Sequence, residues 1–220
     1  MTIHLLDIYR TSNIGIFLKS NERFLLVPRG LATTKIAKLS EYLDAEPVET
    51  SIGGSRLLGP LIAMNGKGML VSRLAEEAEI RHLKESTGLP VERVPARYTS
   101  IGNLISANDK GVVASQLLQG VKDLIVDVLD APVEFLTIAA YHQVGSMMVS
   151  SNAGSAVHPQ ASDEEVSKAA GVLKVDVEPA TVNGGVPFVA SGVVITQEKA
   201  VVGSLTSGPE LIMLSRVFRL

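Results

Sequence analysis

Three features of the sequence have residue types that could perform chemistry. The segment GKGMLV, which begins at Gly66, has the glycine and lysine content of a phosphate-binding loop. The run SDEE from Ser162 offers neighbouring carboxylates, the groups that work as general acid and base. The four histidines are residues of the kind that bind zinc: His4, His82, His142 and His158.

None of these features has the setting that its chemistry requires. Gly66 falls in a hairpin pattern between two strands, and the chain contains no Gly-Lys-Ser or Gly-Lys-Thr. The histidines lie in four separate segments without the spacing of metal ligands. Ser162 and Glu165 have the spacing of a helix capping box. Without any cysteine, the chain also has no thiolate for disulfides, metal binding or nucleophilic attack. The sequence therefore predicts neither a metal nor a cofactor.

The composition is that of a folded chain with no general affinity for nucleic acid. At 220 residues and 46% hydrophobic content, it can bury a substantial core. Its 20 basic residues are outnumbered by 23 acidic ones, so its net charge of −3 is not typical of a protein that coats phosphates. The start, MTIHLLDIYRTSN, lacks the features of a signal peptide, and no apolar run approaches the roughly 20 residues of a membrane helix. We expect a cytoplasmic protein.

An internal repeat organises the chain. Pro-Val-Glu occurs at residues 47–49, 90–92 and 132–134, and a turn ending in glycine follows each time. Aligning the segments after it reveals a longer unit of roughly 43 residues, a period typical of repeat architectures. A fifth copy, SGVVITQEKAVVGS, fits if Ser191 takes the place of the anchoring glycines. Those glycines are Gly15, Gly59, Gly102 and Gly145.

Each unit predicts two strands, a helix and a third strand. Short runs of β-branched and aliphatic residues flank a polar turn, as in a hairpin. Apolar residues then recur at helical spacing, for example Ile36, Leu39 and Leu43. Capping boxes mark two helix starts, at Ser162 and Ser207, and the Pro-Val-Glu segment supplies the third strand. The polar turns are Ser20-Asn21, Asn65-Gly66, Asn108-Asp109, Asn152-Ala153 and Gln197-Glu198.

The two ends of the chain complement each other. The fifth helix, near residues 207–218, has no strand after it, whereas the chain opens with a strand that has no helix before it. An open array would need polar caps at both ends, and a closed ring needs none. We therefore predict an α/β fold: a five-bladed αβ propeller, or pseudo-fivefold ring of ββαβ repeats closed by the N-terminal strand. A doubly wound α/β sheet is the alternative. The expected single domain covers residues 1–220, with repeats at approximately 10–52, 53–96, 97–139, 140–182, and 183–220 plus 1–9.

Several repeat segments resemble one known family. TSIGGSRLLG, IGNLISANDKG, VGSMMVSSNAG and TSGPELIML are similar to archaeal and eukaryotic translation initiation factor six, and the likeness runs from about residue 3 to 218. It implies the pentein fold, a fivefold pseudosymmetric ring. It also implies binding to the intersubunit face of the large ribosomal subunit, which prevents premature joining of the small subunit. A role in large-subunit maturation is implied too, as is release with help from a GTPase related to elongation factor two and its partner protein.

The resemblance singles out two polar residues beside the repeat turns. The matching Arg and Asn of the family lie on the face that meets a large-subunit ribosomal protein, close to a ribosomal RNA loop; in this chain they are Arg56 and Asn103. The structural alternatives are a solvated charge at a strand end for Arg56 and a turn-stabilising side chain for Asn103. The anchoring glycines are interpreted as structural, because crowded turns near a ring axis accept glycine best.

The C-terminal segment SRVFRL offers a second candidate binding site. Arg216 and Arg219 flank Phe218, so this end could touch ribosomal protein or RNA. The alternative is that these residues simply end the fifth helix, where cations interact favourably with the helix dipole.

Two other functions compete with ribosome binding. The pentein ring also hosts amidine-modifying hydrolases and transferases that use a cysteine nucleophile, which this chain lacks. A generic binding ring for another assembly would share the fold but not the partner. A closed ring has no strand edge that requires a second copy, so we expect a monomer. From the net negative charge we expect protein contacts to outweigh phosphate contacts, and so a shallow dependence of binding on salt.

Overall fold

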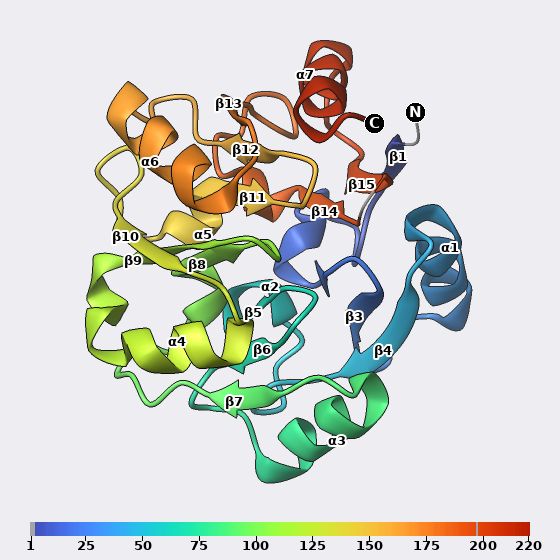
Figure 1. Ribbon diagram of the computed structural model, residues 1–220. Helices are drawn as coiled ribbons and strands as arrows, with labels where there is room; N and C mark the ends of the chain where they lie inside the picture. The colour runs from blue at the N-terminus through green and yellow to red at the C-terminus, as the bar shows by residue number, and fades with distance from the viewer. Residues whose placement is uncertain (1–2, 197) are drawn as a thin grey trace.

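Five three-stranded sheets, each with one long helix, make up the molecule (Figure 1). The computed structural model describes residues 3–196 and 198–220. In every unit the two hairpin strands are antiparallel, and the third strand runs parallel to the second. The predicted ββαβ unit is therefore confirmed. Of the predicted hairpin turns, Gln197-Glu198 lies partly outside the described residues.

The element bounds show how regular the units are. In the order hairpin strands, helix, third strand, they are β2 (Lys19–Ser20), β3 (Phe24–Pro28), α1 (Thr33–Leu43) and β4 (Glu46–Thr50); β5 (Ile62–Met64), β6 (Met69–Val71), α3 (Glu77–Thr87) and β7 (Val91–Arg93); β8 (Ile105–Ala107), β9 (Val112–Ser115), the 3-10 helix η3 (Gln116–Val121) with α4 (Lys122–Leu129), and β10 (Val133–Leu136); β11 (Met148–Ser150), β12 (Ser155–Val157), α6 (Asp163–Leu173) and β13 (Val177–Pro179); and β14 (Val193–Ile195), β15 (Ala200–Gly203), α7 (Gly208–Phe218) and β1 (Ile3–Leu6).

The N-terminal strand completes the last unit. β1 pairs in parallel with β15, from Ile3 opposite Ala200 to Leu6 opposite Gly203. In Figure 1 it lies beside the red strand β15, although the two strands come from opposite ends of the chain. The prediction that the opening strand fills the place left after the fifth helix is confirmed. The doubly wound alternative is wrong, because the described strands form five separate sheets.

The hydrophobic core is divided among the units, and each part joins two neighbouring units. Around α1, for example, Ile36 and Leu39 are buried together with Leu25 of their own sheet and with Val194 and Val201 of the fifth sheet. A repeat of this size cannot bury its apolar face alone, so neighbouring units stabilise one another.

A short helical turn precedes the first strand of each unit: η1 (Ile14–Ile16), α2 (Leu58–Leu61), η2 (Ile101–Asn103), α5 (Val144–Met147) and η4 (Val189–Ser191). Each turn contacts the next one along the chain, and η1 also contacts η4. The anchoring glycines lie at these contacts. A Cβ added at Gly59 would lie 1.9 Å from the carbonyl oxygen of Gly15, and one added at Gly102 would lie 1.9 Å from that of Gly59.

The sequence alignment misplaced the fifth member of this series. A Cβ added at Gly15 would lie 1.9 Å from the carbonyl oxygen of Ala190, so Ala190, and not Ser191, takes the place of the glycines. In this unit alanine stands at the glycine position, so the sequence pattern does not mark it, and the neighbouring Ser191 is the wrong assignment. The structural interpretation of the glycines is supported by this crowding of backbone against backbone.

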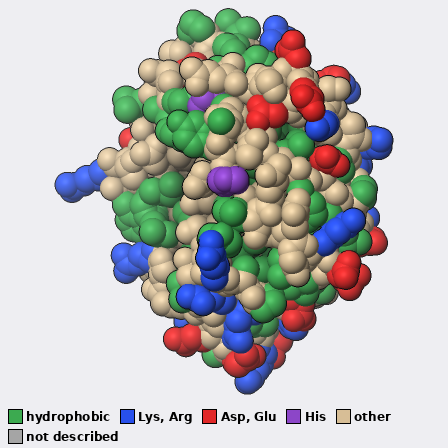
Figure 2. All heavy atoms as spheres, turned by 90° about the vertical axis from the view of Figure 1, so that its left-hand side faces the viewer, with side chains coloured by type: hydrophobic (Ala, Val, Ile, Leu, Met, Phe, Trp, Pro, Cys, Tyr) green, Lys and Arg blue, Asp and Glu red, His purple; other side chains and the backbone are tan. Residues whose placement is uncertain are grey.

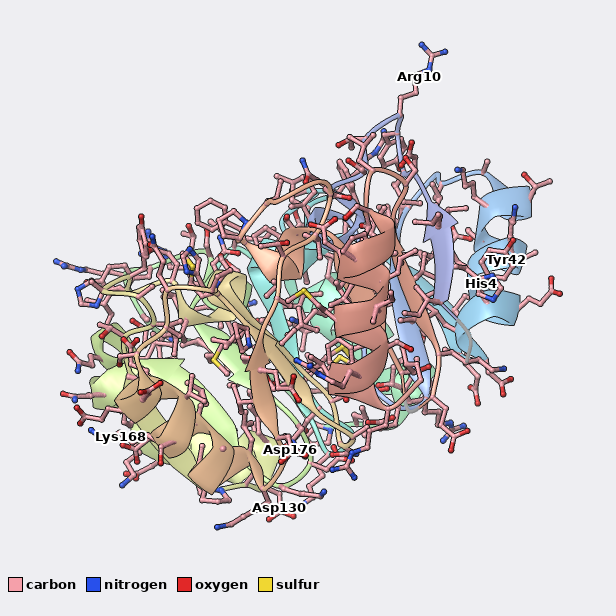
Figure 3. The ribbon with its side chains drawn as sticks, turned by 90° about the horizontal axis from the view of Figure 1, so that it is seen from above. His4, Arg10, Tyr42, Asp130, Lys168 and Asp176 are labelled. Carbon is pink, nitrogen blue, oxygen red and sulfur yellow. The ribbon has the colours of Figure 1, made fainter. Side chains whose placement is uncertain are left out.

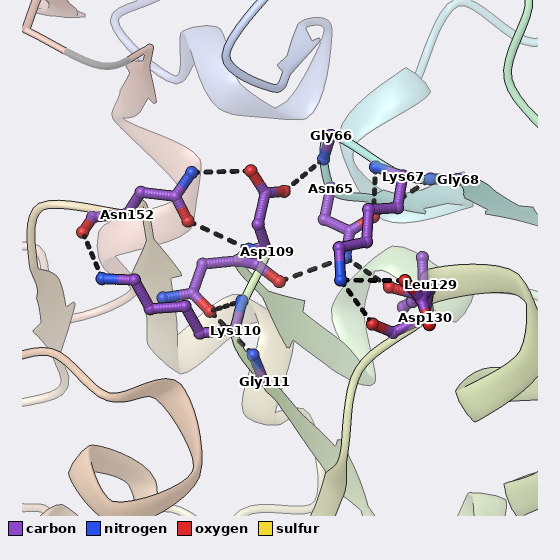
Figure 4. Close-up of polar contacts among 11 residues, drawn as sticks. Asn65, Gly66, Lys67, Gly68, Asp109, Lys110, Gly111, Leu129, Asp130 and Asn152 are labelled. Carbon is purple, nitrogen blue, oxygen red and sulfur yellow. Dashed lines mark hydrogen bonds and ion pairs between the residues drawn. The ribbon is translucent and has the colours of Figure 1, made fainter.

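The hairpin turns link successive units through buried side-chain amides (Figure 4). Asn65 Oδ1 accepts hydrogen bonds from the N–H groups of Lys67 (2.9 Å) and Gly68 (3.1 Å), which closes its own turn. Its Nδ2 donates to the carbonyls of Asn108 (3.1 Å) and Leu129 (2.8 Å) in the next unit. Asn108 repeats the pattern one unit further on.

Removal of the Asn65 amide is expected to be strongly destabilising. Asn65→Ala leaves two buried carbonyls and two N–H groups without these partners, so we expect the free energy of unfolding to fall by about 2–4 kcal/mol. Urea denaturation monitored by circular dichroism measures it. The matched control is Asn103→Ala, because the Asn103 side chain forms no hydrogen bond to any residue that the structure describes. An equal loss in both variants would contradict the role of the Asn65 amide.

Candidate binding surface

The parallel pairing of second and third strands gives the molecule two different ends. Both strands of each unit finish at the same edge of the sheet, so the loops that follow them share one end, called here the loop face. The hairpin turns and the carboxyl ends of the helices share the opposite end, called the hairpin face. In Figure 3, Arg10, from a loop after β1, points away at the top, whereas Asp130 and Asp176 lie at the bottom.

Five exposed arginines follow the strands at the loop face: Arg10, Arg29, Arg56, Arg73 and Arg97. This set is called the arginine patch. Arg56 connects two of its loops: its guanidinium carbon lies 5.7 Å from the centre of the Tyr9 ring, and its Nη2 would be 3.9 Å from a Cβ added at Gly30. None of the five forms an ion pair with a residue in the described ranges. The patch is therefore free to meet an anionic partner.

Exposed apolar side chains accompany the arginines. Tyr9, Leu57, Leu74, Leu117, Tyr141, Phe188 and Leu205 all lie in loop-face segments and are exposed. The rings of Tyr141 and Phe188 lie 6.4 Å apart, and each is 6.1 Å from the ring of His158. In the side view of Figure 2, acidic side chains gather mainly toward the right, and hydrophobic side chains toward the left. Apolar and aromatic residues mixed with arginine are typical of protein interfaces.

Carboxylates at the starts of three helices, two of them buried, hold several loops of this face in place. Glu210, the third residue of the α7 capping box, accepts hydrogen bonds from the N–H groups of Gly184 (3.0 Å) and Gly185 (2.8 Å) and from the Thr181 hydroxyl (2.8 Å). Both glycines have positive φ. Glu79 and Glu165 play the same part in their own units. The carboxylates of Glu79, Glu165 and Glu210 therefore accept hydrogen bonds from the loops and form no ion pair with the arginine patch in the described structure.

The environment of Glu210 predicts a specific effect of acid on stability. Burial alone would raise the pKa of Glu210, but hydrogen bonds from Ser207, Thr181, Gly185 and Gly184 outweigh it and lower the pKa to about 2. A carboxylate whose pKa is lower in the folded state contributes stability that is complete above its unfolded pKa of about 4.3 and is lost as the pH falls toward 2. Glu210→Gln should therefore be less stable than the parent at pH 7, and the difference should vanish near pH 2. Denaturation curves across this range measure it; a constant difference would contradict the assignment.

The two residues singled out by the sequence both belong to this end of the molecule. Arg56 is exposed and forms part of the arginine patch. Asn103 is half-buried in η2, which lies at the loop-face end because β8 starts there and runs antiparallel to β9. It lines a cavity of 440 Å³, called here the axial cavity, whose lining comes from the helical turns and first strands of all five units. The described structure contains no hydrogen bond between Arg56 and Asn103.

The C-terminal residues lie elsewhere. Phe218 is only 1% exposed and packs in the core of the fifth unit. Arg216 forms an ion pair with Glu178, and Arg219 lies 2.8 Å from Asp176 at the hairpin face. The structure thus favours the helix-end interpretation for all three residues.

Sequence reasoning missed four of the five arginines, because they belong to different repeats and no short motif contains them. Placing each basic residue on the predicted ββαβ unit would have found them, since each follows the end of a second or third strand.

No group of three or more His, Asp or Glu residues that could hold a metal ion occurs in the described part of the chain. None of its helices is long and apolar enough to cross a membrane.

Comparison with known proteins gives a consistent result. The eIF-6 family matches residues 3–217. The translation initiation factor 6 of Cenarchaeum symbiosum is 41% identical over 219 residues, which is 99% of both chains. That of Nitrosopumilus maritimus is 40% identical over the same length and coverage, and that of Pyrococcus abyssi is 37% identical over 226 residues and the whole of both chains.

Proposed function

The chain belongs to the eIF-6 family of initiation factors in protein biosynthesis, and we propose that it binds the large ribosomal subunit through its loop face and so prevents association with the small subunit. The observation that carries this proposal is the loop face itself, where five unpaired arginines among the described residues lie next to exposed apolar side chains. Such a surface suits a site that combines ribosomal protein with ribosomal RNA.

We infer that the five units close into a pentein ring. Three observations support this: β1 pairs with β15, the core around α1 includes the fifth sheet, and the Thr196 hydroxyl donates to the Leu43 carbonyl at 2.8 Å. The last contact links unit five to unit one in the way that Asn65 links to Leu129. A closed and rigid ring presents its loops in one arrangement, so docking loses little conformational entropy.

No chemical step is needed for the proposed action. A protein that binds only the free large subunit opposes subunit joining by mass action, by about 2.7 kcal/mol at a free concentration a hundredfold above its dissociation constant. An amidine-modifying enzyme would require a cysteine, and the chain has none. We therefore propose a non-enzymatic, monomeric and cytoplasmic blocker. Its part in large-subunit maturation, and its release by a GTPase and partner protein, are proposed from the family resemblance alone.

Sedimentation tests the proposal directly. The protein is mixed with purified large and small subunits and run through a sucrose gradient. We expect it to migrate with large subunits only, and we expect fewer joined ribosomes in its presence. Migration with neither subunit would contradict the proposal and favour a generic binding ring.

Single substitutions separate binding from folding. Arg56→Ala and Asn103→Ala should each weaken migration with large subunits by about tenfold in affinity, a change of about 1.4 kcal/mol. Their melting temperatures should stay close to that of the parent, because Arg56 is exposed, Asn103 is only half-buried, and neither has an ion pair in the described structure. A parallel loss of stability would make these residues structural.

A further inference from the structure

The axial cavity contains an uncompensated positive charge. Its lining comes from all five units, and within the described chain Lys19 of β2 is the one charged residue in it. The other lining residues are glycines, apolar residues and neutral polar residues, without a carboxylate. Lys19 forms no ion pair with any described residue. The volume of 440 Å³ is within the range of small-molecule sites, about 300–1,000 Å³.

The surroundings of Lys19 disfavour its charge. Burial lowers the pKa of its ammonium group to about 8. Lys19 still keeps partial exposure, because it faces the cavity. An ammonium group that has lost much of its hydration and has no counter-ion is a group that a bound anion would stabilise.

The strand hydroxyl groups of Ser106 and Ser150 in the lining already donate within the protein. Ser155 Oγ donates to the carbonyl of Val149 (3.1 Å), and contacts of 2.9 Å and 2.8 Å join Ser155 to Ser150 and Ser150 to Ser106. Because the Ser155 proton points to Val149, the other two contacts use the protons of Ser150 and Ser106. This chain of hydroxyls therefore has no free proton for a ligand.

The Ser20 hydroxyl is committed as well, since it donates to the Ile195 carbonyl at 2.6 Å. Lys19 is therefore the one charged donor of the described lining, beside neutral groups such as the Asn103 amide and the Ser146 hydroxyl. Lysine suits a single carboxylate in this way, whereas phosphate groups are held best by several donors or by the bidentate guanidinium of arginine. The apolar lining, which includes Met148, Val194 and Ile195, suits an apolar body attached to the carboxylate.

We propose that the axial cavity is a binding site for a small organic monocarboxylate, whose carboxylate pairs with Lys19 and whose apolar body contacts the hydrophobic lining. The site is independent of ribosome binding, because it requires only the isolated protein. A ligand seated there would contact residues from several units at once.

The test measures the titration of Lys19 itself. Lysines are labelled by reductive methylation with ¹³C-formaldehyde, and the Lys19 resonance is assigned by its loss in Lys19→Met, or in Lys19→Gln if the first variant does not fold. Benzoate is the probe, and benzamide is its neutral counterpart. If benzoate binds only the charged form, the pKa of Lys19 should rise by about one unit at ten times the dissociation constant. Benzamide should cause no shift.

Each outcome bears on the proposal. A shift with benzoate and not with benzamide or an equal concentration of sodium chloride supports it, as does the loss of benzoate binding heat in Lys19→Met. No shift up to the solubility limit of benzoate overturns it. A larger shift with inorganic phosphate than with benzoate overturns the assignment to carboxylates. Failure of ribosome binding in the gradient would leave each of these results unchanged, so the two proposals are tested separately.

Discussion

The variant Gly102→Ala should lose about 3 kcal/mol of folding free energy. An added Cβ would lie 1.9 Å from the carbonyl oxygen of Gly59 and 2.6 Å from that of Ile62. Both atoms belong to the backbone of the neighbouring unit, so a change of side-chain rotamer cannot relieve the overlap. The helical turns would have to separate, and each turn also contacts the next one. Guanidinium denaturation measures the loss.

The control for this variant has the opposite expected sign. Gly171 lies in the exposed part of α6, has no positive φ, and has nothing within 4 Å of an added Cβ. Gly171→Ala should therefore stabilise the protein by about 0.5–1 kcal/mol, because alanine is the better helix former. Equal stability of Gly102→Ala and the parent would show that the helical turns are loosely packed and would contradict the account of the glycines.

The regular parts of the fold were predictable because they depend on patterns that recur in the chain. The hairpins and the helices each recur in five units, and Pro-Val-Glu occurs three times, so a weak local pattern is supported by its copies. The place of the N-terminal strand followed from the missing strand after residue 218. Two capping boxes were visible as Ser-x-x-Glu; the third, with Glu76 in place of serine, was missed because glutamate is not a usual N-cap residue.

The binding surface was less predictable because it depends on how the repeats are placed in space. Arg56 and Asn103 were chosen through resemblance, whereas Arg29 and Arg73 became candidates only when their loops were found at the same end. The net charge of the chain, −3, does not reveal that these arginines share one end of the molecule. Many of its acids pair with bases of the helices, strands and hairpin turns, or accept hydrogen bonds from the loops, as Glu79 does. Composition alone predicts that binding to the large subunit depends only weakly on salt. The arginine patch predicts a steeper dependence, because exposed arginines that meet phosphates are sensitive to salt.

The triple variant Arg29→Glu, Arg56→Glu and Arg73→Glu should lose at least about 100-fold in affinity for the large subunit, which corresponds to about 2.7 kcal/mol. Three exposed cations of the loop face become anions, and each that meets a phosphate or carboxylate in the parent would then repel it. The parent should also bind more weakly as salt rises, and the triple variant should show a smaller slope of log K against log salt, by about 2–3 if all three arginines meet phosphates. Gradient sedimentation over a series of salt concentrations measures both quantities.

A variant of equal charge separates the position of the arginines from their number. Lys38, Arg81 and Lys174 are exposed on or beside the outer helices, and none has an ion pair within the described ranges. Changing these three to glutamate alters the net charge by the same amount, so any general repulsion from the ribosome is equal in both variants. Near-parental binding by this control, together with loss of binding by the loop-face variant, would assign the interaction to the loop face. Equal losses would mean that overall charge, and not the arginine patch, governs the association.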